Sequence, residues 1–591
     1  MSNIEKLDHL RLQMSNANIT AIVITGTDPH QSEYLAEHWN DRFWLSGFAG
    51  SAGSIVVTQD FAGLWTDSRY FLQGEQELKG TGITLMKQKV QFHPEHIHWL
   101  ADNLPSGAAI AINGLTLSVK QHENYRKLLP KSFTIDTDID LIRDIWQNRP
   151  AFSNKKIMIL EERYTGKSSL DKINDIIKYN RDHDLDYSVF TSLDDIAWLL
   201  NMRGSDVSFN PLFMSYLMIG NDKSALFTHS NKIDDLILVY LDYLNVKLHE
   251  YEEIGSFLSK LDSKSRVGFD LNVASVAVYN FCNASKVQMD NPVNLSKAIK
   301  NYTEILNTEQ AMISDGVALA QTFYWLEKVL EKEGSTTEYE VANMLASNRS
   351  KQSNYISESF AAIVGYKGNG AIIHYHPTAD NHALIKKEGV LLVDSGGQYL
   401  TGTTDITRTL ALSQPTDEVK TNFTLVLKGL IALTQAVFPK GTLGVQLEIL
   451  ARQYLWKHHL NYSHGTGHGV GYFLNVHEGP QGFSGLNSSR GKTAFVPGMI
   501  TSNEPGYYKE NEYGIRIENL LLCIEDEHPG FLRFKTLTYY PIDLTMVDGN
   551  MLNKDEKDWL NSYHNKVYEK VSPLLDEEIK EWFSAKCNSI Y

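Results

Sequence analysis

The stretch Val390-Leu-Leu-Val-Asp-Ser-Gly-Gly-Gln-Tyr-Leu-Thr-Gly-Thr-Thr-Asp-Ile-Thr-Arg-Thr-Leu410 places Asp394 and Asp405 on either side of a glycine-rich turn. Apolar and β-branched residues on both sides of the turn predict a β-hairpin. If the two aspartates pair across it, their Cβ atoms lie within about 5 Å. Carboxylates that close repel, and one stays protonated unless a cation lies between them. The pair predicts a metal site, although one exposed and one hydrogen-bonded aspartate in an ordinary turn fit equally well.

A second segment, Tyr462-Ser-His-Gly-Thr-Gly-His-Gly-Val-Gly-Tyr-Phe-Leu-Asn-Val-His-Glu-Gly-Pro480, holds His464, His468 and His477 among closely spaced glycines. The glycines disfavour a helix, so His464 and His468 do not share one helical face. Glycine instead lets the backbone pass close to a ligand. A single histidine is more often structural, but several in such a loop indicate a functional site.

Two glutamates complete the set. Glu504 stands where a predicted strand meets a Pro-Gly turn, and Glu518 lies in Tyr513-Gly-Ile-Arg-Ile-Glu-Asn-Leu-Leu-Leu522. Period-two alternation places Arg516 and Glu518 on one face of that strand. Burying Glu518 unpaired is costly, so it needs a metal or Arg516 as its partner, unless the strand is exposed.

The charges favour two metal ions. Asp394, Asp405, Glu504 and Glu518 contribute four negative charges, which two divalent ions cancel. An oxygen-rich set with one imidazole and no thiolate suits Mn²⁺, with Zn²⁺, Co²⁺ or iron as alternatives.

Composition excludes several other classes of protein. The chain has 591 residues and a formal net charge of −16, which argues against a nucleic-acid-binding protein. Three well-separated cysteines argue against a disulfide scaffold. The charged N-terminus lacks the apolar core of a signal peptide, and the apolar runs are too short to cross a membrane. We therefore expect a cytoplasmic protein with no membrane partner.

An internal repeat indicates a duplicated α/β domain. The segment that begins Asp41-Arg-Phe-Trp-Leu matches the one that begins Asp195-Ile-Ala-Trp-Leu, and Leu64-Trp-Thr-Asp-Ser-Arg echoes Leu226-Phe-Thr-His-Ser-Asn in the same order. We expect α/β domains at 1–147 and 148–301, with a seam near Asn148-Arg-Pro. The third domain, 302–591, is expected to begin with a long amphipathic helix over 308–330 and to end in a helical extension over 555–585.

These motifs together resemble the X-prolyl aminopeptidases (aminopeptidase P) of the methionine-aminopeptidase/prolidase, or pita-bread, superfamily, and the match is close to the three-domain cytosolic form. The resemblance covers nearly the whole chain. It is carried by His30-Gln-Ser-Glu-Tyr, Ser46-Gly-Phe-Ala-Gly-Ser-Ala-Gly, Trp65-Thr-Asp-Ser-Arg-Tyr-Phe, Arg203-Gly-Ser-Asp-Val, Asn210-Pro, Ala371-Ile-Ile-His-Tyr, Asp394-Ser-Gly, Gly402-Thr-Thr-Asp-Ile-Thr-Arg, His464-Gly-Thr-Gly-His-Gly-Val-Gly, Asn475-Val-His-Glu-Gly-Pro, Glu504-Pro-Gly-Tyr-Tyr and Gly514-Ile-Arg-Ile-Glu-Asn.

The resemblance implies a fold and a set of roles. The fold would be two creatinase-N-like α/β domains followed by a pita-bread metallopeptidase domain, of mixed α/β and α+β class. Two divalent metal ions, most simply Mn²⁺, would be held by Asp394, Asp405, His468, Glu504 and Glu518. Further roles fall to Glu504, His477 and His374 in catalysis, to Arg69, His374, His464 and His477 in substrate binding, and to Arg516 as a partner that orients Glu518.

The implied reaction is hydrolysis of the N-terminal X-Pro bond of peptides, with release of the first residue, by a homodimer formed through the catalytic domain. Two alternatives stay open. A prolidase shares the metal set but cuts only dipeptides, and a non-catalytic pita-bread protein would have lost at least one ligand.

Overall fold

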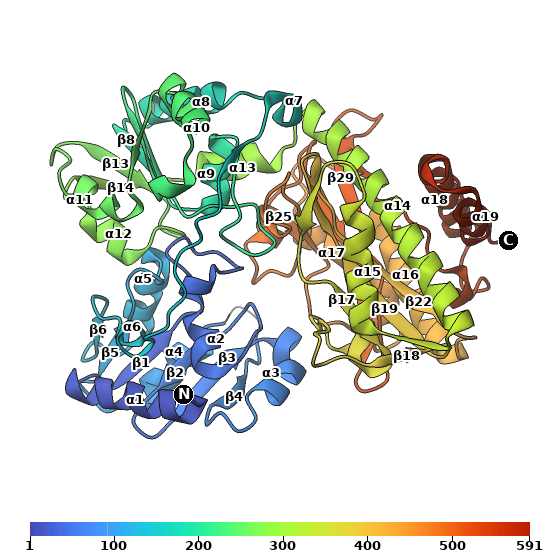
Figure 1. Cartoon of the computed structure of the whole chain (residues 1–591), viewed down its shortest axis with the longest axis horizontal. Helices are drawn as coiled ribbons and strands as arrows, with labels where there is room; N and C mark the ends of the chain where they lie inside the picture. Colours follow the sequence, from blue (N-terminus) through green and yellow to red (C-terminus); the bar gives the residue numbers. More distant parts are fainter. Residues whose placement is uncertain (91–92) are drawn as a thin grey trace. The chain divides into compact units, whose positions relative to one another are not determined.

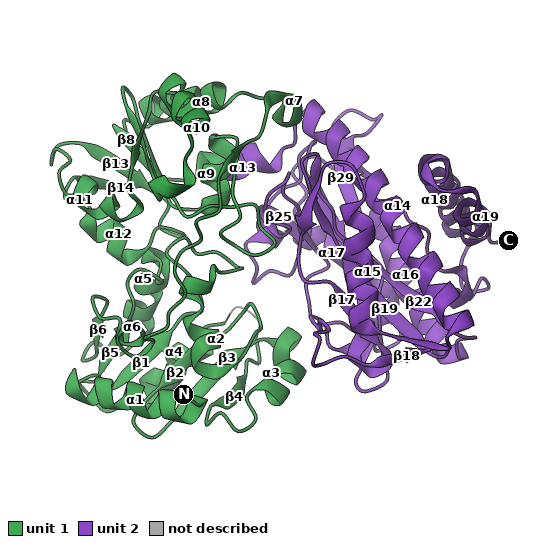
Figure 2. Cartoon of the chain, in the orientation of Figure 1, with its two compact units in different colours: residues 1–293 green, residues 294–591 purple. Residues whose placement is uncertain are grey.

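The computed structural model describes residues 1–90 and 93–591, and the chain divides into two compact units, Met1–Val293 and Asn294–Tyr591 (Figures 1 and 2). The expected domain boundaries at 147/148 and 301/302 stay predictions. Within the described residues, no helix is both long and apolar enough to cross a membrane.

The first part of unit 1 is a six-stranded sheet in the order β4-β3-β2-β1-β5-β6. Alternate residues of β1 enter different cores: Ile22 and Ile24 join one apolar cluster, and Val23 joins another. Helices therefore cover both faces, as expected for an α/β domain. The elements are α1 (Asn3–Asn16), β1 (Ala21–Ile24), α2 (Asp41–Ser46), β2 (Ser54–Val57), β3 (Ala62–Thr66), α3 (Phe71–Glu77), β4 (Thr84–Lys87), α4 (Glu95–Asn103), β5 (Ala109–Ile112), α5 (Val119–Leu128), β6 (Thr134–Asp136) and α6 (Leu141–Ile145).

The second part of unit 1 repeats this topology. Its sheet order is β12-β11-β10-β8-β13-β14, with the same succession of parallel and antiparallel neighbours. The elements are β7 (Met158–Ile159), α7 (Glu162–Thr165), α8 (Ser169–Asp182), β8 (Tyr187–Phe190), α9 (Leu193–Leu199), β9 (Met202–Arg203), β10 (Tyr216–Gly220), β11 (Ser224–Phe227), α10 (Asp235–Tyr243), β12 (Val246–His249), α11 (Ile254–Leu258), β13 (Arg266–Phe269), α12 (Val276–Phe281) and β14 (Ser285–Gln288). Helix α13 (Pro292–Ala298) follows, and most of it belongs to unit 2.

The two copies meet through equivalent segments. Ser118 and Ser275 each cap the helix that follows them, and they form an antiparallel bridge with each other. Around it, the amide of Val119 donates to the carbonyl of Ala274 at 3.0 Å, and that of Val276 donates to Leu117 at 2.9 Å. Such reciprocal pairing is the mark of an isologous, two-fold-like contact. The duplication inferred from the sequence is therefore confirmed in the fold.

Unit 2 packs helices against antiparallel sheets. Its principal sheets are β17-β19-β22 and β23-β30-β29-β26-β24-β25, with smaller sheets β15-β18, β16-β20-β21 and β27-β28. One continuous apolar core joins them to the helices, including Val364 and Val393 of the first sheet and Ile500 and Leu520 of the second.

The strands of unit 2 are β15 (Ser335–Thr337), β16 (Tyr355–Glu358), β17 (Ile363–Tyr366), β18 (Leu384–Lys386), β19 (Val390–Ser395), β20 (Gly397–Tyr399), β21 (Gly402–Thr403), β22 (Ile406–Ala411), β23 (Val437–Pro439), β24 (Gly467–Gly469), β25 (Glu478–Phe483), β26 (Ile500–Asn503), β27 (Gly506–Lys509), β28 (Tyr513–Arg516), β29 (Asn519–Glu525) and β30 (Phe531–Thr536). Its helices are α14 (Tyr302–Lys332), α15 (Glu338–Ser350), α16 (Asp417–Thr434), α17 (Gly444–Trp456), α18 (Lys554–Val571) and α19 (Glu577–Lys586).

The long helix predicted over 308–330 is confirmed as α14, which starts earlier than expected. Asn301 caps it, because its side chain accepts from the Glu304 amide while the Glu304 side chain accepts from the Asn301 amide. The predicted C-terminal helical extension is present as α18 and α19.

Candidate metal centre

Asp394 lies on β19 and Asp405 directly precedes β22, the neighbouring strand, so the two aspartates are not directly opposite each other. Asp394 of β19 stands opposite Thr407 of β22, and Asp405 precedes Thr407 by two residues. The sequence suggested direct pairing of Asp394 and Asp405 across the hairpin. In the structure the partner of Asp394 is Thr407, so Asp405 is displaced from direct pairing by two residues. The two carboxylates are nevertheless close enough for the charge of Asp394 to raise the pKa of Asp405.

A histidine and two glutamates join them. His468 lies on β24, Glu504 directly after β26, and Glu518 between β28 and β29. Nε2 of His468 lies 3.3 Å from Oε1 of Glu504 and 3.6 Å from Oδ2 of Asp405. Ligand-type atoms of Asp405, His468 and Glu518 all lie within 4.8 Å of one another. Unit 2 thus brings the sequence-predicted ligands together.

The convergence of negative charge raises the pKa of these carboxyls. Burial, followed by the charges of Glu518 and Asp394, raises the pKa of Asp405 well above its ordinary value. Burial, with the charges of Glu504 and Asp394, does the same for Glu518. For Glu504, burial and the charge of Asp394 outweigh Arg516 and raise its pKa to about 7. Without a cation, the site therefore holds protons that ordinary carboxyls release.

The donor set fits divalent metal ions. Among the described residues, Oδ1 of Asp394 and Oε1 of Glu518 are buried without a hydrogen-bond partner, although such atoms are costly to leave unsatisfied. Nδ1 of His468 lies 3.0 Å from the carbonyl of Gly469. If Nδ1–H donates there, Nε2 is left with a lone pair that faces the carboxylates, as a metal-binding imidazole requires.

Arg516 has a different partner from the one expected. Its Nη2 donates to Oδ2 of Asp394 at 2.6 Å, rather than to Glu518. Glu518 lies beyond the end of β28, where period-two alternation no longer fixes its direction, and its Oε2 accepts from the Thr407 hydroxyl at 2.9 Å. The expectation that Arg516 orients Glu518 is thus replaced by an Arg516–Asp394 ion pair.

Three supporting residues were not identified from the sequence. Thr407 binds Glu518, and the Ser502 hydroxyl donates to Glu504 at 3.1 Å. The Tyr508 hydroxyl lies 2.8 Å from Nε2 of His464 and accepts from Arg516 at 2.7 Å. A signal existed for Thr407, which follows Asp405 by two residues, the spacing of side chains on one face of an extended strand. The bridging position of Tyr508 depends on how β27 pairs with β28.

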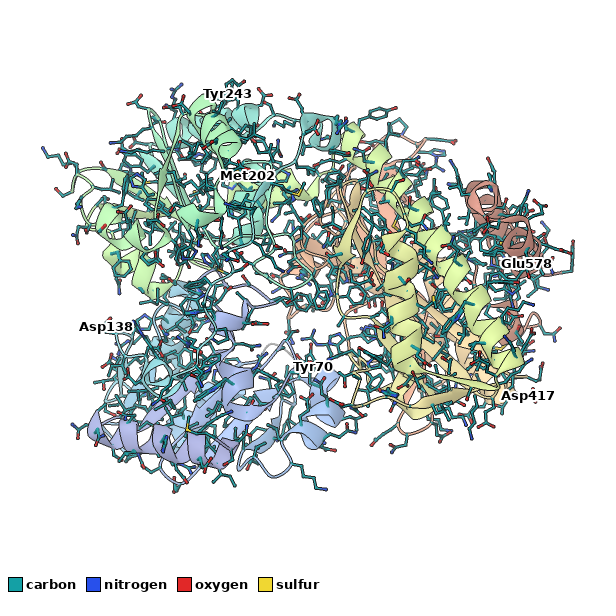
Figure 3. The ribbon with its side chains drawn as sticks, in the orientation of Figure 1. Tyr70, Asp138, Met202, Tyr243, Asp417 and Glu578 are labelled. Carbon is teal, nitrogen blue, oxygen red and sulfur yellow. The ribbon has the colours of Figure 1, made fainter. Side chains whose placement is uncertain are left out.

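The remaining predicted residues fall in two places. His477 lies beside the centre, because its ring is nearly perpendicular to that of His468 with centroids 4.3 Å apart. His374 is half-buried and follows Ile373, whose carbonyl lies 3.4 Å from Nη2 of Arg516. Arg69 belongs to unit 1, next to Tyr70 (labelled in Figure 3), and it forms a two-point ion pair with Asp67 at 2.8 and 2.7 Å.

The raised pKa values predict how the metal-free protein responds to pH. The folded state binds more protons than the unfolded chain between about pH 4.5 and 7, so the free energy of unfolding falls as pH rises through this window. Asp405→Asn removes one of the repelling charges. Metal-free Asp405→Asn should therefore melt about 2–4 °C above metal-free wild type at pH 7.5, the shift that roughly 1 kcal/mol gives, and the difference should shrink toward pH 5.

Differential scanning calorimetry after chelation tests this prediction. Thr407→Val is the matched control, because it alters a neighbour of the centre without removing a charge. A metal-free Asp405→Asn protein that melts below wild type at pH 7.5 would contradict the electrostatic account.

Comparison with known proteins places this geometry in a family. The model of metallopeptidase family M24 matches residues 307–525, and that of the C-terminal region of peptidase M24 matches 530–590. Two models of the creatinase/prolidase N-terminal domain match 6–145 and 148–304.

Full-length relatives agree with these matches. Aminopeptidase P2 of Arabidopsis thaliana is 39% identical, over 97% of this chain and 86% of its own. Xaa-Pro aminopeptidase 1 of Dictyostelium discoideum is 38% identical, over 97% of this chain and 94% of its own. The crystal structure of X-prolyl aminopeptidase from Caenorhabditis elegans, described as a cytosolic enzyme with a di-nuclear active site, covers 100% of both chains at 33% identity with a TM-score of 0.95.

Proposed function

The chain belongs to metallopeptidase family M24 as an Xaa-Pro aminopeptidase, and from this we propose which of its residues perform the hydrolysis of the N-terminal X-Pro bond. The observation that carries the proposal is the convergence of Asp405, His468 and Glu518 on one point. Asp394 and Glu504, whose carboxyls raise the pKa of this cluster, complete the ligand set.

Asp394 would hold one ion, Asp405 and Glu518 would bridge, and His468 with Glu504 would hold the other. The ions, when bound, supply a water of lowered pKa and Lewis-acid polarisation of the scissile carbonyl. We propose Mn²⁺ as the native metal, because four carboxylates and one imidazole form an oxygen-rich set. Arg516 and Thr407 would keep Asp394 and Glu518 in place as hydrogen-bonded partners of the ligands.

The remaining roles follow from position. Glu504 accepts the proton of the attacking water and delivers it to the proline nitrogen as that nitrogen leaves. His477, beside His468, donates to the oxyanion of the tetrahedral intermediate together with His374. Nε2 of His464 is within hydrogen-bonding distance of the Tyr508 hydroxyl. We therefore assign His464 to the wall of the proline pocket rather than to proton transfer. Arg69 is proposed as a residue that contacts the substrate, on the resemblance of its Trp-Thr-Asp-Ser-Arg motif to the family.

Two further proposals concern the whole molecule. We infer a cytoplasmic enzyme, since the C. elegans relative is described as cytosolic. We also propose a homodimer formed through the catalytic unit, unit 2, as the resemblance to the family implies.

Peptide length separates this function from that of a prolidase. The enzyme should release free arginine from Arg-Pro-Pro and leave Pro-Pro intact, as measured by mass spectrometry of the products. N-acetylation of the tripeptide should lower the rate at least tenfold, about the effect of losing one charged contact in a binding site. Cleavage confined to the dipeptide Arg-Pro would favour the prolidase alternative.

A further inference from the structure

A buried ion pair joins Lys300 to Glu478, the residue that directly follows His477. Lys300, in the link between α13 and α14, binds Oε1 of Glu478, the first residue of β25. The two side chains are 1% and 0% exposed, and Nζ of Lys300 also donates to the carbonyl of Lys297 at 3.0 Å. Desolvation of both charges cancels most of their attraction, so such a pair is a poor stabiliser compared with packed apolar side chains. Its place in the fold points to another role.

Glu478 lies where the two histidines meet. It directly follows His477, and in the ladder between β24 and β25 it stands opposite Gly469, which directly follows His468. The register shifts between His468 and Gly469, so the ladder is irregular at the point that directs the His468 ring. The backbone of Glu478 is thus adjacent to His477 along the chain and to the residue after His468 across the ladder.

The surrounding glycines leave few other anchors for this segment. A Cβ on Gly467 would lie 1.8 Å from the carbonyl oxygen of Ser502, and one on Gly469 would lie 2.5 Å from that of Glu478. The backbone therefore packs at distances that only glycine permits, and these positions have no side chains to hold the loop. A side-chain anchor has to come from a neighbouring residue, and Glu478 is one, held by Lys300.

We propose that the Lys300–Glu478 ion pair is a positioning device that fixes the directions of His477 and His468. The inference rests on the proposed function, which gives His477 to the oxyanion and His468 to the metal. Lys300 does not touch the reacting atoms. It acts through Glu478, so the ion pair serves the geometry of the site rather than stability.

Lys300→Met tests this directly, because it keeps the length of the side chain and removes the charge. We expect kcat for Arg-Pro-Pro to fall at least about tenfold, with KM changed less than threefold, and the affinity for Mn²⁺ in a titration of the chelated protein to fall about tenfold, as for other outer partners of metal ligands. Glu478→Gln should show the same pattern more weakly, and it carries the test if Lys300→Met does not fold.

Lys428→Met is the matched control. Lys428 binds Glu556 at 2.6 Å in the same unit, with side chains 14% and 6% exposed, and it contacts none of the proposed site residues. This variant should lose thermal stability while keeping kcat and Mn²⁺ affinity within about twofold, as expected of a change remote from the site.

The double variant Lys300→Met/Glu478→Leu separates positioning from stability. It leaves no uncompensated charge, so its melting temperature should recover toward wild type, while kcat stays low. Wild-type kcat and Mn²⁺ affinity in Lys300→Met, or a kcat that recovers together with stability, would overturn the proposal. If wild type does not cleave Arg-Pro-Pro, the proposed function is wrong. The role of the ion pair is then tested by the Mn²⁺ titration alone, in which Lys300→Met should still bind Mn²⁺ more weakly than wild type.

Discussion

Asp405→Ala is expected to lower kcat/KM for Arg-Pro-Pro at least about 1,000-fold, beyond the 10–100-fold that outer partners of metal ligands typically cost. Asp405 is surrounded by Glu518, Asp394 and Glu504, whose charges together with burial raise its pKa well above the ordinary value. Only a cation makes such a group of ionised carboxylates stable. Loss of the proposed bridging ligand should therefore weaken both metal positions.

Asp405→Asn is the control that separates charge from shape, since the amide keeps the size of the side chain. It should lose activity to a similar extent and also lose the stabilisation that Mn²⁺ gives to wild type. Initial rates measured over a range of Mn²⁺ concentrations distinguish weak binding from slow chemistry. Full activity of Asp405→Ala would refute the assignment of the ligands.

The second large effect concerns proline. Arg-Pro-Pro should be cleaved at least about 100-fold more efficiently than Arg-Ala-Ala, as judged by kcat/KM, because a fitted pocket discriminates about 10–200-fold for each missing methylene. The X-Pro bond has no N–H group and a locked φ, which ordinary peptidases handle poorly. In this chain His464, with its ring against Tyr508, is the proposed wall of the pocket.

His464→Ala supplies the internal comparison. It should reduce the preference for Arg-Pro-Pro over Arg-Ala-Ala, whereas Lys428→Met should leave it unchanged. Competition between the two tripeptides in one reaction gives the ratio directly. Equal cleavage by wild type would exclude proline specificity.

Much of the fold could be predicted because the repeat is visible in the sequence. The segments that begin at Asp41 and Asp195 form equivalent helices, α2 and α9, and those at Leu64 and Leu226 lie on equivalent strands, β3 and β11. Both copies show the same local patterns because each has to bury the same faces of its helices and strands.

The site was predictable only as far as its residue types and spacing allowed. The carboxylates and glycine-flanked histidines indicated a metal centre, and the resemblance to a family supplied their roles. Three features depend on contacts between residues that are distant in the chain or on neighbouring strands, and local patterns could not predict them. They are the register between β19 and β22, the ion pair between Arg516 and Asp394, and the hydrogen bond between Tyr508 and Arg516. The Lys300–Glu478 ion pair likewise joins two residues far apart in the sequence, and no local sequence pattern predicts their contact.

The most direct test of the metal assignment is to measure bound metal and tripeptide cleavage on the same sample. The protein is chelated, reloaded with Mn²⁺, freed of excess metal and examined by elemental mass spectrometry alongside the release of arginine from Arg-Pro-Pro. The assignment predicts two ions per chain, with activity lost on chelation and restored in proportion to occupancy. Undiminished cleavage by a metal-free chain, or a reloaded chain that holds no stoichiometric metal, would contradict it.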